Sequence, residues 1–247
     1  MKSERHETAP SAGRFLTARW LRLAMINYEV DAEVLRARVP RGTEIDTWDG
    51  RSFVSVVGFQ FLNTRVHGIA VPFHRNFVEV NLRFYVRRSL DNEVRRGVVF
   101  VKELVPRRAL ALVANVVYNE NYQALPMSSE DTGDRVEYSW VHRGQPHRMS
   151  VSISGNSYQP SADSEERFIT EHYWGYVTQR DSATVEYQVE HPPWRVWRGH
   201  DPTFECDVDA LYGAEFAPAL SRKPFSCFLA EGSDVVVRKG VRLEANA

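Results

Sequence analysis

The segment from Asn76 to Arg88, NFVEVNLRFYVRR, alternates two kinds of side chain at every second position. A period of two is typical of a β-strand, because successive side chains point to opposite faces of a sheet. One face is apolar and predicts core packing, and it consists of Val78, Val80, Leu82, Phe84 and Val86. The other face carries Phe77, Glu79, Asn81, Arg83 and Tyr85. This second face meets either water or an enclosed space, and the alternation leaves both interpretations open.

Strand-like stretches recur along the chain and are separated by turn residues. Asp49-Gly50 is a strong hairpin turn pair within residues 43–61, and Gly232-Ser233 predicts a second hairpin within residues 225–243. Residues 62–75 contain glycine and proline and are expected to form a loop. Further strands are predicted at residues 14–30, 98–105, 134–143, 147–156 and 183–191.

Three short helices are predicted between these strands. The first covers residues 32–39, with Asp31 as its N-cap and Pro40 as its stop. The second covers about residues 107–118 after Pro106, and the third covers residues 164–176, with Asp163 and Glu166 spaced as a capping box. The sequence therefore predicts a β-rich α+β protein built on a curved or barrel-like antiparallel sheet.

Length and composition indicate one folded unit. A chain of 247 residues with 43% hydrophobic residues can bury a sizeable core, and no linker or repeat divides it. Residues 1–13 are polar and lack periodicity, so they are expected to form a flexible tail. Residues 14–247 are expected to form a single domain.

Charge and cysteine content exclude several classes of partner. The formal net charge is −1, with 31 basic against 32 acidic side chains, so neither nucleic acid nor a membrane surface is an expected partner. The polar N-terminal segment does not resemble a signal peptide, which makes a cytoplasmic location the expectation. Cys206 and Cys227 are too few for a disulfide scaffold and lack metal-ligand spacing, although a bridge between them stays open. No metal or cofactor is expected, and a homo-oligomer is left open.

Two aromatic segments have both a packing and a functional interpretation. His191 to Trp194, HPPW, is best interpreted as a rigid corner, and the alternative places His191 or Trp194 at the mouth of a cavity. The aromatic residues of EHYWGY are expected to pack at the end of the third helix. His67 and His74 flank the predicted loop before residue 76, but their spacing is not diagnostic of a metal site.

Several segments together resemble one family. NYEVDAEVLRARVPRGTEID, residues 27–46, resembles the first segment of the acetoacetate decarboxylase-like superfamily. FHRNFVEVNLRFYV, ERFITEHYWGY and EHPPWRV resemble its YqjF-like branch of bacterial proteins. The resemblance extends from about Phe15 to Leu243. It implies a cone-like β-barrel around a mostly apolar cavity, in which the decarboxylases use a Schiff-base lysine with a nearby glutamate and arginine.

The resemblance places the catalytic glutamate of the decarboxylases near Glu79. Their lysine falls at about Asn121 within YNENYQ, residues 118–123, a stretch that contains no lysine. Their arginine falls near Leu21, which is flanked by Arg19 and Arg22. Classical Schiff-base decarboxylation is therefore not expected.

Lys102 is the remaining candidate for an amine mechanism. The chain contains only four lysines, Lys2, Lys102, Lys223 and Lys239. Simple alternation along residues 98–105 puts Lys102 on one face with Val98, Phe100 and Leu104, which could place it beside the cavity with a pKa lowered by desolvation. The competing interpretation is a strand-end lysine that pairs with a surface acid.

These observations lead to a hypothesis about function and to two alternatives. The hypothesis is a cavity that binds a small carbonyl- or carboxylate-containing molecule, with Arg83 pairing a carboxylate and Glu79 acting as a general acid or base. The first alternative is a lyase or hydro-lyase that uses Glu79, or a decarboxylase that uses Lys102. The second is a non-catalytic sensor or interaction domain. The expected lining residues are Glu79, Asn81, Arg83, Tyr118, Asn121 and Tyr122, with Arg19 and Arg22 nearby.

Overall fold

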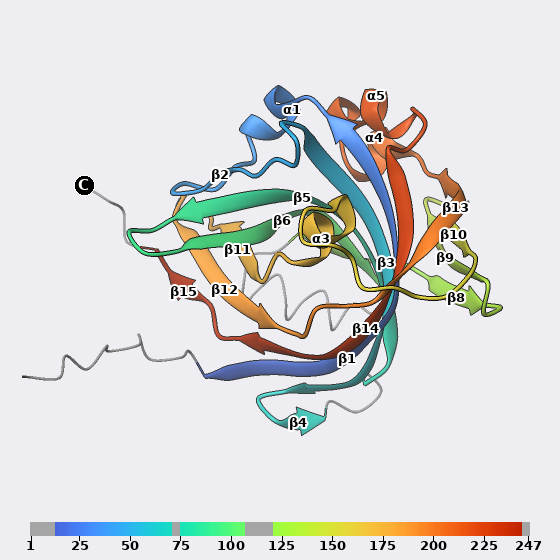
Figure 1. Cartoon of the computed structure of the whole chain (residues 1–247), viewed down its shortest axis with the longest axis horizontal. Coiled ribbons are helices and arrows are strands. Elements are labelled where there is room, and N and C mark those ends of the chain that lie inside the picture. The colour runs from blue at the N-terminus through green and yellow to red at the C-terminus, as the bar shows by residue number, and fades with distance from the viewer. Residues whose placement is uncertain (1–12, 71–74, 107–120, 244–247) are drawn as a thin grey trace, which may run out of the picture.

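A closed ring of seven strands dominates the architecture (Figure 1). The computed structural model describes residues 13–70, 75–106 and 121–243. The strands follow one another around the ring in the order β12, β11, β6, β5, β3, β1 and β14, and a short β12–β14 pairing, Val189 with Val237, closes it. Their bounds are β1 Arg14–Val30, β3 Ser52–Val66, β5 Phe77–Ser89, β6 Val94–Val105, β11 Trp174–Thr178, β12 Thr184–Glu190 and β14 Ser226–Arg238.

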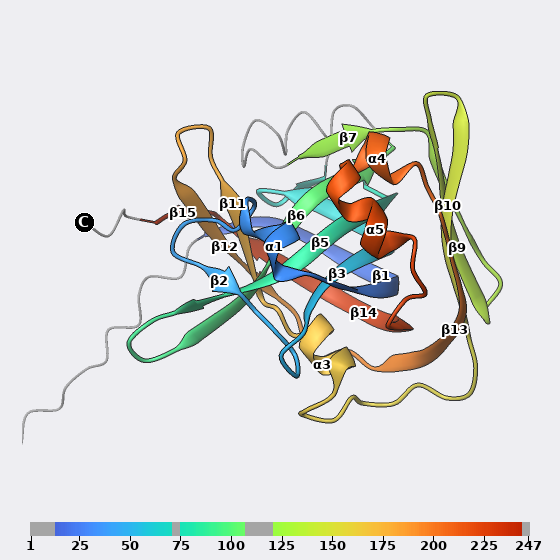
Figure 2. The same ribbon diagram turned by 90° about the horizontal axis from the view of Figure 1, so that it is seen from above.

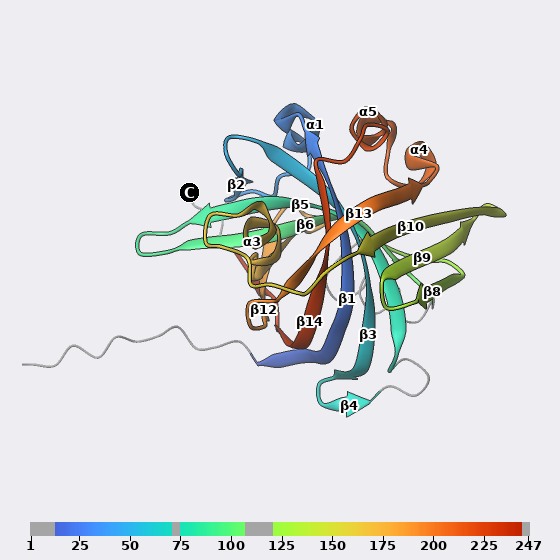
Figure 3. The same ribbon diagram turned by 45° about the vertical axis from the view of Figure 1, so that its right-hand side comes forward.

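A second group of strands extends from β14 as a wing on the outside of the ring (Figure 3). β13 pairs with the end of β14 that lies away from β12, and β10, β9 and β8 follow in that order. The wing strands are β8 Met127–Asp131, β9 Arg135–His142, β10 Gln145–Ile153 and β13 Val196–Glu205. The remaining short strands are β2 Glu44–Ile45, β4 Ile69–Ala70, β7 Tyr122–Ala124 and β15 Val241–Arg242. Most pairings are antiparallel, as predicted, but β11 and β7 pair with β6 in parallel.

The short helices cover two different parts of the ring. α1 (Ala32–Arg36) begins at Asp31, whose side chain caps the helix as predicted. α4 (Val208–Leu211), the 3-10 helix η1 (Ala214–Phe216) and α5 (Ala217–Leu220) lie on the outer side together with the wing (Figure 3). α3 (Glu165–Thr170) lies over one end of the ring (Figure 1), with Phe168 and Ile169 buried inside. None of the helices within the described ranges is long and apolar enough to cross a membrane.

The two faces of the ring strands belong to two separate hydrophobic cores. The apolar face of β5 packs in the outer core, where Val80, Leu82, Phe84 and Val86 are fully buried against residues of the wing and the C-terminal helices. Gly58 of β3 allows this close approach, because a Cβ atom there would collide with Tyr138 and Met149 of the wing. The inner core combines aliphatic residues with many aromatic ones, among them Phe53, Phe59 and Trp194. The second face of β5 therefore points into the ring, which resolves the question that the alternation left open.

Two element predictions were wrong because strands run further than local turn signals indicate, and a third was confirmed only in part. Gly232 does not form a hairpin turn, since β14 continues through it with φ 87° while it pairs with Leu21 of β1. β3 extends to Val66 and forms a small hairpin with β4 inside the predicted loop. Asp49-Gly50 does form a turn, with a Trp48–Arg51 bridge, but the preceding β2 pairs with β5 instead of β3.

The helix predictions also need correction. The third helix is shorter than expected, because it ends at Thr170 and the aromatic segment enters β11. Its N-cap is Ser164, not Asp163, since the Ser164 side chain accepts the hydrogen bond from the Arg167 amide. The short helices between residues 208 and 220 were not predicted. The helix expected at about residues 107–118 and the tail at residues 1–12 lie outside the described residues.

Candidate functional site

The ring encloses a cavity of about 220 Å³. Most of its wall is aromatic or aliphatic, which is typical of sites for small organic molecules. All seven ring strands contribute, together with β7 and the segments on either side of β11 and β12. The polar or ionisable lining residues are Thr64, Glu79, Asn81, Arg83, Glu103, Tyr122, Thr170, His172, Tyr187 and His191, with Trp20, Trp174 and Trp194 contributing indole rings.

β5 supplies three consecutive inward-facing polar residues, as the alternation predicts. Glu79 is 2% exposed and Asn81 1% exposed, and Asn81 Nδ2 donates a hydrogen bond of 2.9 Å to Glu79 Oε1. Burial raises the pKa of Glu79 to about 7, although hydrogen bonds from Asn81 and Tyr122 and the charge of Arg83 oppose the shift. Glu79 can therefore hold or release a proton near neutral pH.

A β-bulge in β6 decides which of its residues face the cavity. Leu82 pairs with Lys102 and Arg83 pairs with Phe100, so Val101 is an extra residue in the strand. The bulge reverses the alternation beyond it. Glu103, which is 2% exposed, therefore lines the cavity opposite Asn81, and Lys102 does not.

Lys102 lies on the opposite face of β6, towards the outer layer. Its pKa is lowered by partial burial and by the charge of Arg38, which belongs to the segment after α1. The prediction that Lys102 shares a face with Val98 and Phe100 was wrong, because the bulge at Val101 interrupts the period of two.

Arg83 places a cation at the cavity wall. Its Nη2 donates only a long hydrogen bond, 3.4 Å, to the Ile169 carbonyl, and its guanidinium packs 5.7 Å from the centre of the Tyr85 ring. No ion pair among the described residues includes Arg83, whereas the neighbouring Arg87 and Arg88 each pair with a glutamate. The charge of Arg83 acts on Glu79, but an arginine that forms no ion pair with the described residues of a largely apolar cavity is suited to bind an anionic group.

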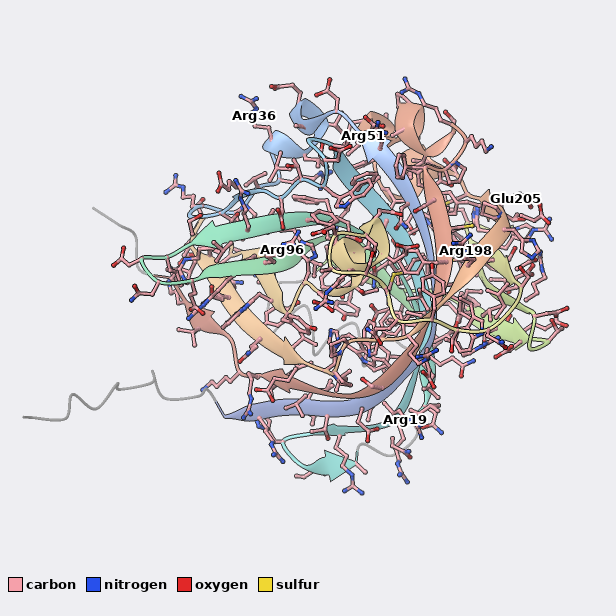
Figure 4. The ribbon with its side chains drawn as sticks, viewed as in Figure 1. Arg19, Arg36, Arg51, Arg96, Arg198 and Glu205 are labelled. Atoms are coloured by element: carbon pink, nitrogen blue, oxygen red, sulfur yellow. The ribbon has the colours of Figure 1, made fainter. Side chains whose placement is uncertain are left out.

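An aspartate–histidine pair at the same cavity was not predicted. His172 lines the wall just after α3, and its Nε2 lies 3.0 Å from Asp46 Oδ2. The same Asp46 oxygen accepts a hydrogen bond of 2.7 Å from Arg96 Nε. Figure 4 shows Arg96 beside α3. Burial lowers the pKa of His172 to about 4, although the Asp46 hydrogen bond opposes this. The sequence signal is weak, because 126 residues separate the two partners.

The HPPW segment combines both of its interpretations. His191 and Trp194 line the cavity, and they also stack on each other with ring centroids 4.0 Å apart. Trp194 Nε1 donates to Ser233 Oγ at 2.9 Å, which anchors the corner to β14. Burial lowers the pKa of His191 to about 4, so this imidazole is neutral at neutral pH.

Several residues proposed from the sequence do not line the cavity. Arg19 is exposed and points away from the ring (Figure 4), and Arg22 pairs at 2.7 Å with Asp131 of the wing. Asn121 supports the bulge, since its Nδ2 donates a hydrogen bond of 2.8 Å to the Val101 carbonyl. Tyr122 does line the cavity, and Tyr118 lies outside the described residues.

The remaining sequence candidates do not form a metal or disulfide site in the described ranges. His67 lies in the turn between β3 and β4 against Phe15, and His74 lies outside those ranges. No cluster of three or more histidine, cysteine or acidic side chains suited to a metal occurs where the structure describes the chain. Cys206 and Cys227 are free thiols, and burial raises their pKa values to about 12 and about 11.

Buried polar atoms that lack a hydrogen-bond partner gather on the cavity wall. Native interiors leave few such atoms, and those that occur often mark a missing ligand or water. Along the described part of the chain, several of them belong to residues of the wall. They include Trp20 Nε1, Thr64 Oγ1, Glu79 Oε2, Asn81 Oδ1, Arg83 Nε and His172 Nδ1.

The chain belongs to the DUF2071 family, which is described as an uncharacterized conserved protein, and the family model matches residues 17–234. One relative is the uncharacterized protein YqjF of Bacillus subtilis (strain 168). It is 29% identical over 180 residues, which cover 71% of this chain and 72% of YqjF.

Solved structures with the same fold are acetoacetate decarboxylase-like. The enduracididine biosynthesis enzyme MppR, complexed with pyruvate, has a TM-score of 0.67 at 15% identity. The match covers 99% of this chain and 96% of the MppR chain. Acetoacetate decarboxylase from Legionella pneumophila also has a TM-score of 0.67, at 11% identity. The match covers 99% of this chain and 92% of the decarboxylase chain. The expected family and fold are thereby confirmed.

Proposed function

We propose that the ring cavity binds a small organic molecule that carries a carboxylate or carbonyl group. The observation that carries this proposal is the Arg83 guanidinium, which lies at a mostly apolar wall and forms no ion pair with any described residue. A bound carboxylate would supply the missing anion and accept two parallel N–H bonds. The fold similarity to MppR, which is complexed with pyruvate, supports a small keto acid or a related acid.

Glu79 supplies the proton-transfer group of the proposed site. With a pKa of about 7, its carboxyl is partly protonated at neutral pH and can donate to a ligand oxygen or accept a proton from it. This supports the alternative that the protein is a lyase or hydro-lyase. The amine alternative loses support, because Lys102 lies outside the cavity and Lys223 and Lys239 are exposed.

The interaction-domain alternative expects the Glu79 face of β5 to meet solvent or a partner. Glu79 and Asn81 are instead almost fully buried, and both face the enclosed cavity. Burial of this kind favours a small ligand over a protein surface.

A thermal-shift screen of small mono- and dicarboxylic acids, keto acids and neutral ketones tests the proposal. Arg83→Gln is compared with the matched control Arg87→Gln, whose side chain leaves the same strand towards Glu44 outside the cavity. We expect carboxylates to stabilise the wild type and Arg87→Gln, and Arg83→Gln to lose affinity by roughly 10- to 100-fold. Equal responses of the two variants would remove the proposed carboxylate site.

A further inference from the structure

Asp46 fixes the tautomer of His172. Asp46 Oδ1 accepts a hydrogen bond of 3.0 Å from the Thr47 amide, and Oδ2 accepts one of 2.7 Å from Arg96 Nε. Burial raises the pKa of Asp46, but the hydrogen bonds from His172 and Arg96 outweigh it and keep the carboxyl charged. A carboxylate can only accept hydrogen bonds, so the His172 Nε2 atom 3.0 Å away must carry the hydrogen. A neutral imidazole has one N–H, and His172 Nδ1 is therefore a bare acceptor.

His172 Nδ1 is the polar atom of this ring that remains for a bound molecule. The side chain is 1% exposed, and the rings of Tyr85 and Phe168 pack against it at 4.7 Å and 5.0 Å. Nε2 is occupied by Asp46, while Nδ1 is buried and has no partner among the described residues. Leaving a buried acceptor unsatisfied is costly, and a ligand with a donor would remove that cost.

Arg83 lines the same cavity as this acceptor, which sets the chemistry of a molecule that meets both. Tyr85 links them, because the Arg83 guanidinium packs 5.7 Å from the same ring that contacts His172. A small molecule can then place a carboxylate on Arg83 and a hydrogen-bond donor on Nδ1. An ammonium group as the donor would bring a second positive charge next to Arg83, whereas a hydroxyl would not.

We propose that His172 Nδ1 accepts a hydrogen bond from the ligand, so that the cavity selects small hydroxy acids over the matching keto acids and unsubstituted acids. This inference rests on the proposed function, because it takes Arg83 as the carboxylate site. A keto oxygen would place its lone pairs against the lone pair of Nδ1, and an unsubstituted acid would leave Nδ1 without a donor. His172 therefore determines specificity, and Asp46 positions it.

Calorimetric titration with two matched series of acids tests the inference. The first series is lactate, pyruvate and propionate, and the second is 3-hydroxybutyrate, acetoacetate and butyrate. In the wild type we expect at least one hydroxy acid to bind about tenfold more tightly than its two counterparts. His172→Phe keeps a ring of similar shape and should abolish this preference. His172→Asn offers an oxygen near the Nδ1 position and should restore part of the preference.

The outcomes separate the inference from the proposed function. If the acids bind and Arg83→Gln weakens them, but the wild type shows no hydroxy preference or His172→Phe retains it, the inference is overturned and the carboxylate site stands. If no acid of either series binds, or Arg83→Gln binds them all as the wild type does, both fail. The ¹⁵N spectrum of histidine-labelled wild-type protein adds a test that needs no variant. We expect an unprotonated Nδ1 and a protonated Nε2 at His172, and the reverse assignment would overturn the inference.

Discussion

Two buried acidic residues of the ring have opposite surroundings. Glu186 of β12 is 5% exposed, and it pairs with Arg88 at 3.1 Å and with Arg95 at 2.5 Å. Glu79 is 2% exposed and has hydrogen bonds from the neutral side chains of Asn81 and Tyr122, with one oxygen left over. Glu186 thus belongs to a satisfied structural cluster, whereas Glu79 and Arg83 belong to one that a ligand can complete. Polar residues that are fully paired stabilise a fold, and those left incomplete in a cavity indicate function.

The largest effect is expected at the satisfied cluster. Glu186→Ala would leave Arg88 without its acid and Arg95 with Glu93 alone, and it should lower the free energy of unfolding by about 3 kcal/mol. Urea-induced unfolding measures this change, and it should leave the relative affinities for carboxylates unaltered. A loss below about 0.5 kcal/mol, the usual limit for surface positions, would show that the cluster is not structural.

Glu79→Gln should reveal the pH dependence of the incomplete cluster. Folding raises the pKa of Glu79 from its ordinary value of 4.5 to about 7, so the folded state binds the proton more tightly than the unfolded state. Between these two pH values the Glu79 contribution to stability falls as pH rises. The free energy of unfolding of Glu79→Gln, taken relative to that of the wild type, should therefore rise by about 2 kcal/mol from pH 4.5 to pH 7.

Urea unfolding across this pH range measures that difference. Glu165 also has a pKa raised by burial to about 7, and it contributes equally to both proteins, so comparing the variant with the wild type isolates Glu79. Parallel stability curves for the two proteins would contradict the raised pKa.

Arg83→Met should stabilise the unliganded protein by about 1 kcal/mol, because it removes a guanidinium that the described residues leave unpaired in an apolar cavity. The sign is opposite to that for Glu186→Ala, although both changes remove one charged member of a cluster. Thermal and urea unfolding without ligand give the sign directly. A clear destabilisation would mean that Arg83 has a structural role like that of Glu186.

The smallest effect is expected for Lys102→Ala. Lys102 faces the outer layer near Arg38, so carboxylate affinity should stay within about twofold of the wild type. Borohydride treatment of the wild type during incubation with acetoacetate should leave the mass of the protein unchanged. A covalent adduct on Lys102 would restore the amine mechanism.

The alternation of residues 77–86 was sufficient to predict β5 and the separation of its two faces, because one unbroken period of two determines both. The same rule failed on β6, where the single extra residue Val101 moves Glu103 into the cavity and Lys102 out of it. Local patterns do not show bulges, because a bulge depends on the partner strand and here on the distant Asn121 side chain. The Asp46–His172 pair was missed for a related reason, since tertiary folding alone brings the two residues together. Figure 2 shows the segment that follows β2 beside α3.

The central claim is that Arg83 holds a carboxylate inside the ring. A crystal structure with the tightest-binding acid of the two series tests this claim most directly. We predict that the carboxylate lies within hydrogen-bond distance of the Arg83 guanidinium, with a polar oxygen of the acid near Glu79. An acid bound outside the ring, or bound inside it with its carboxylate away from Arg83, would contradict the account.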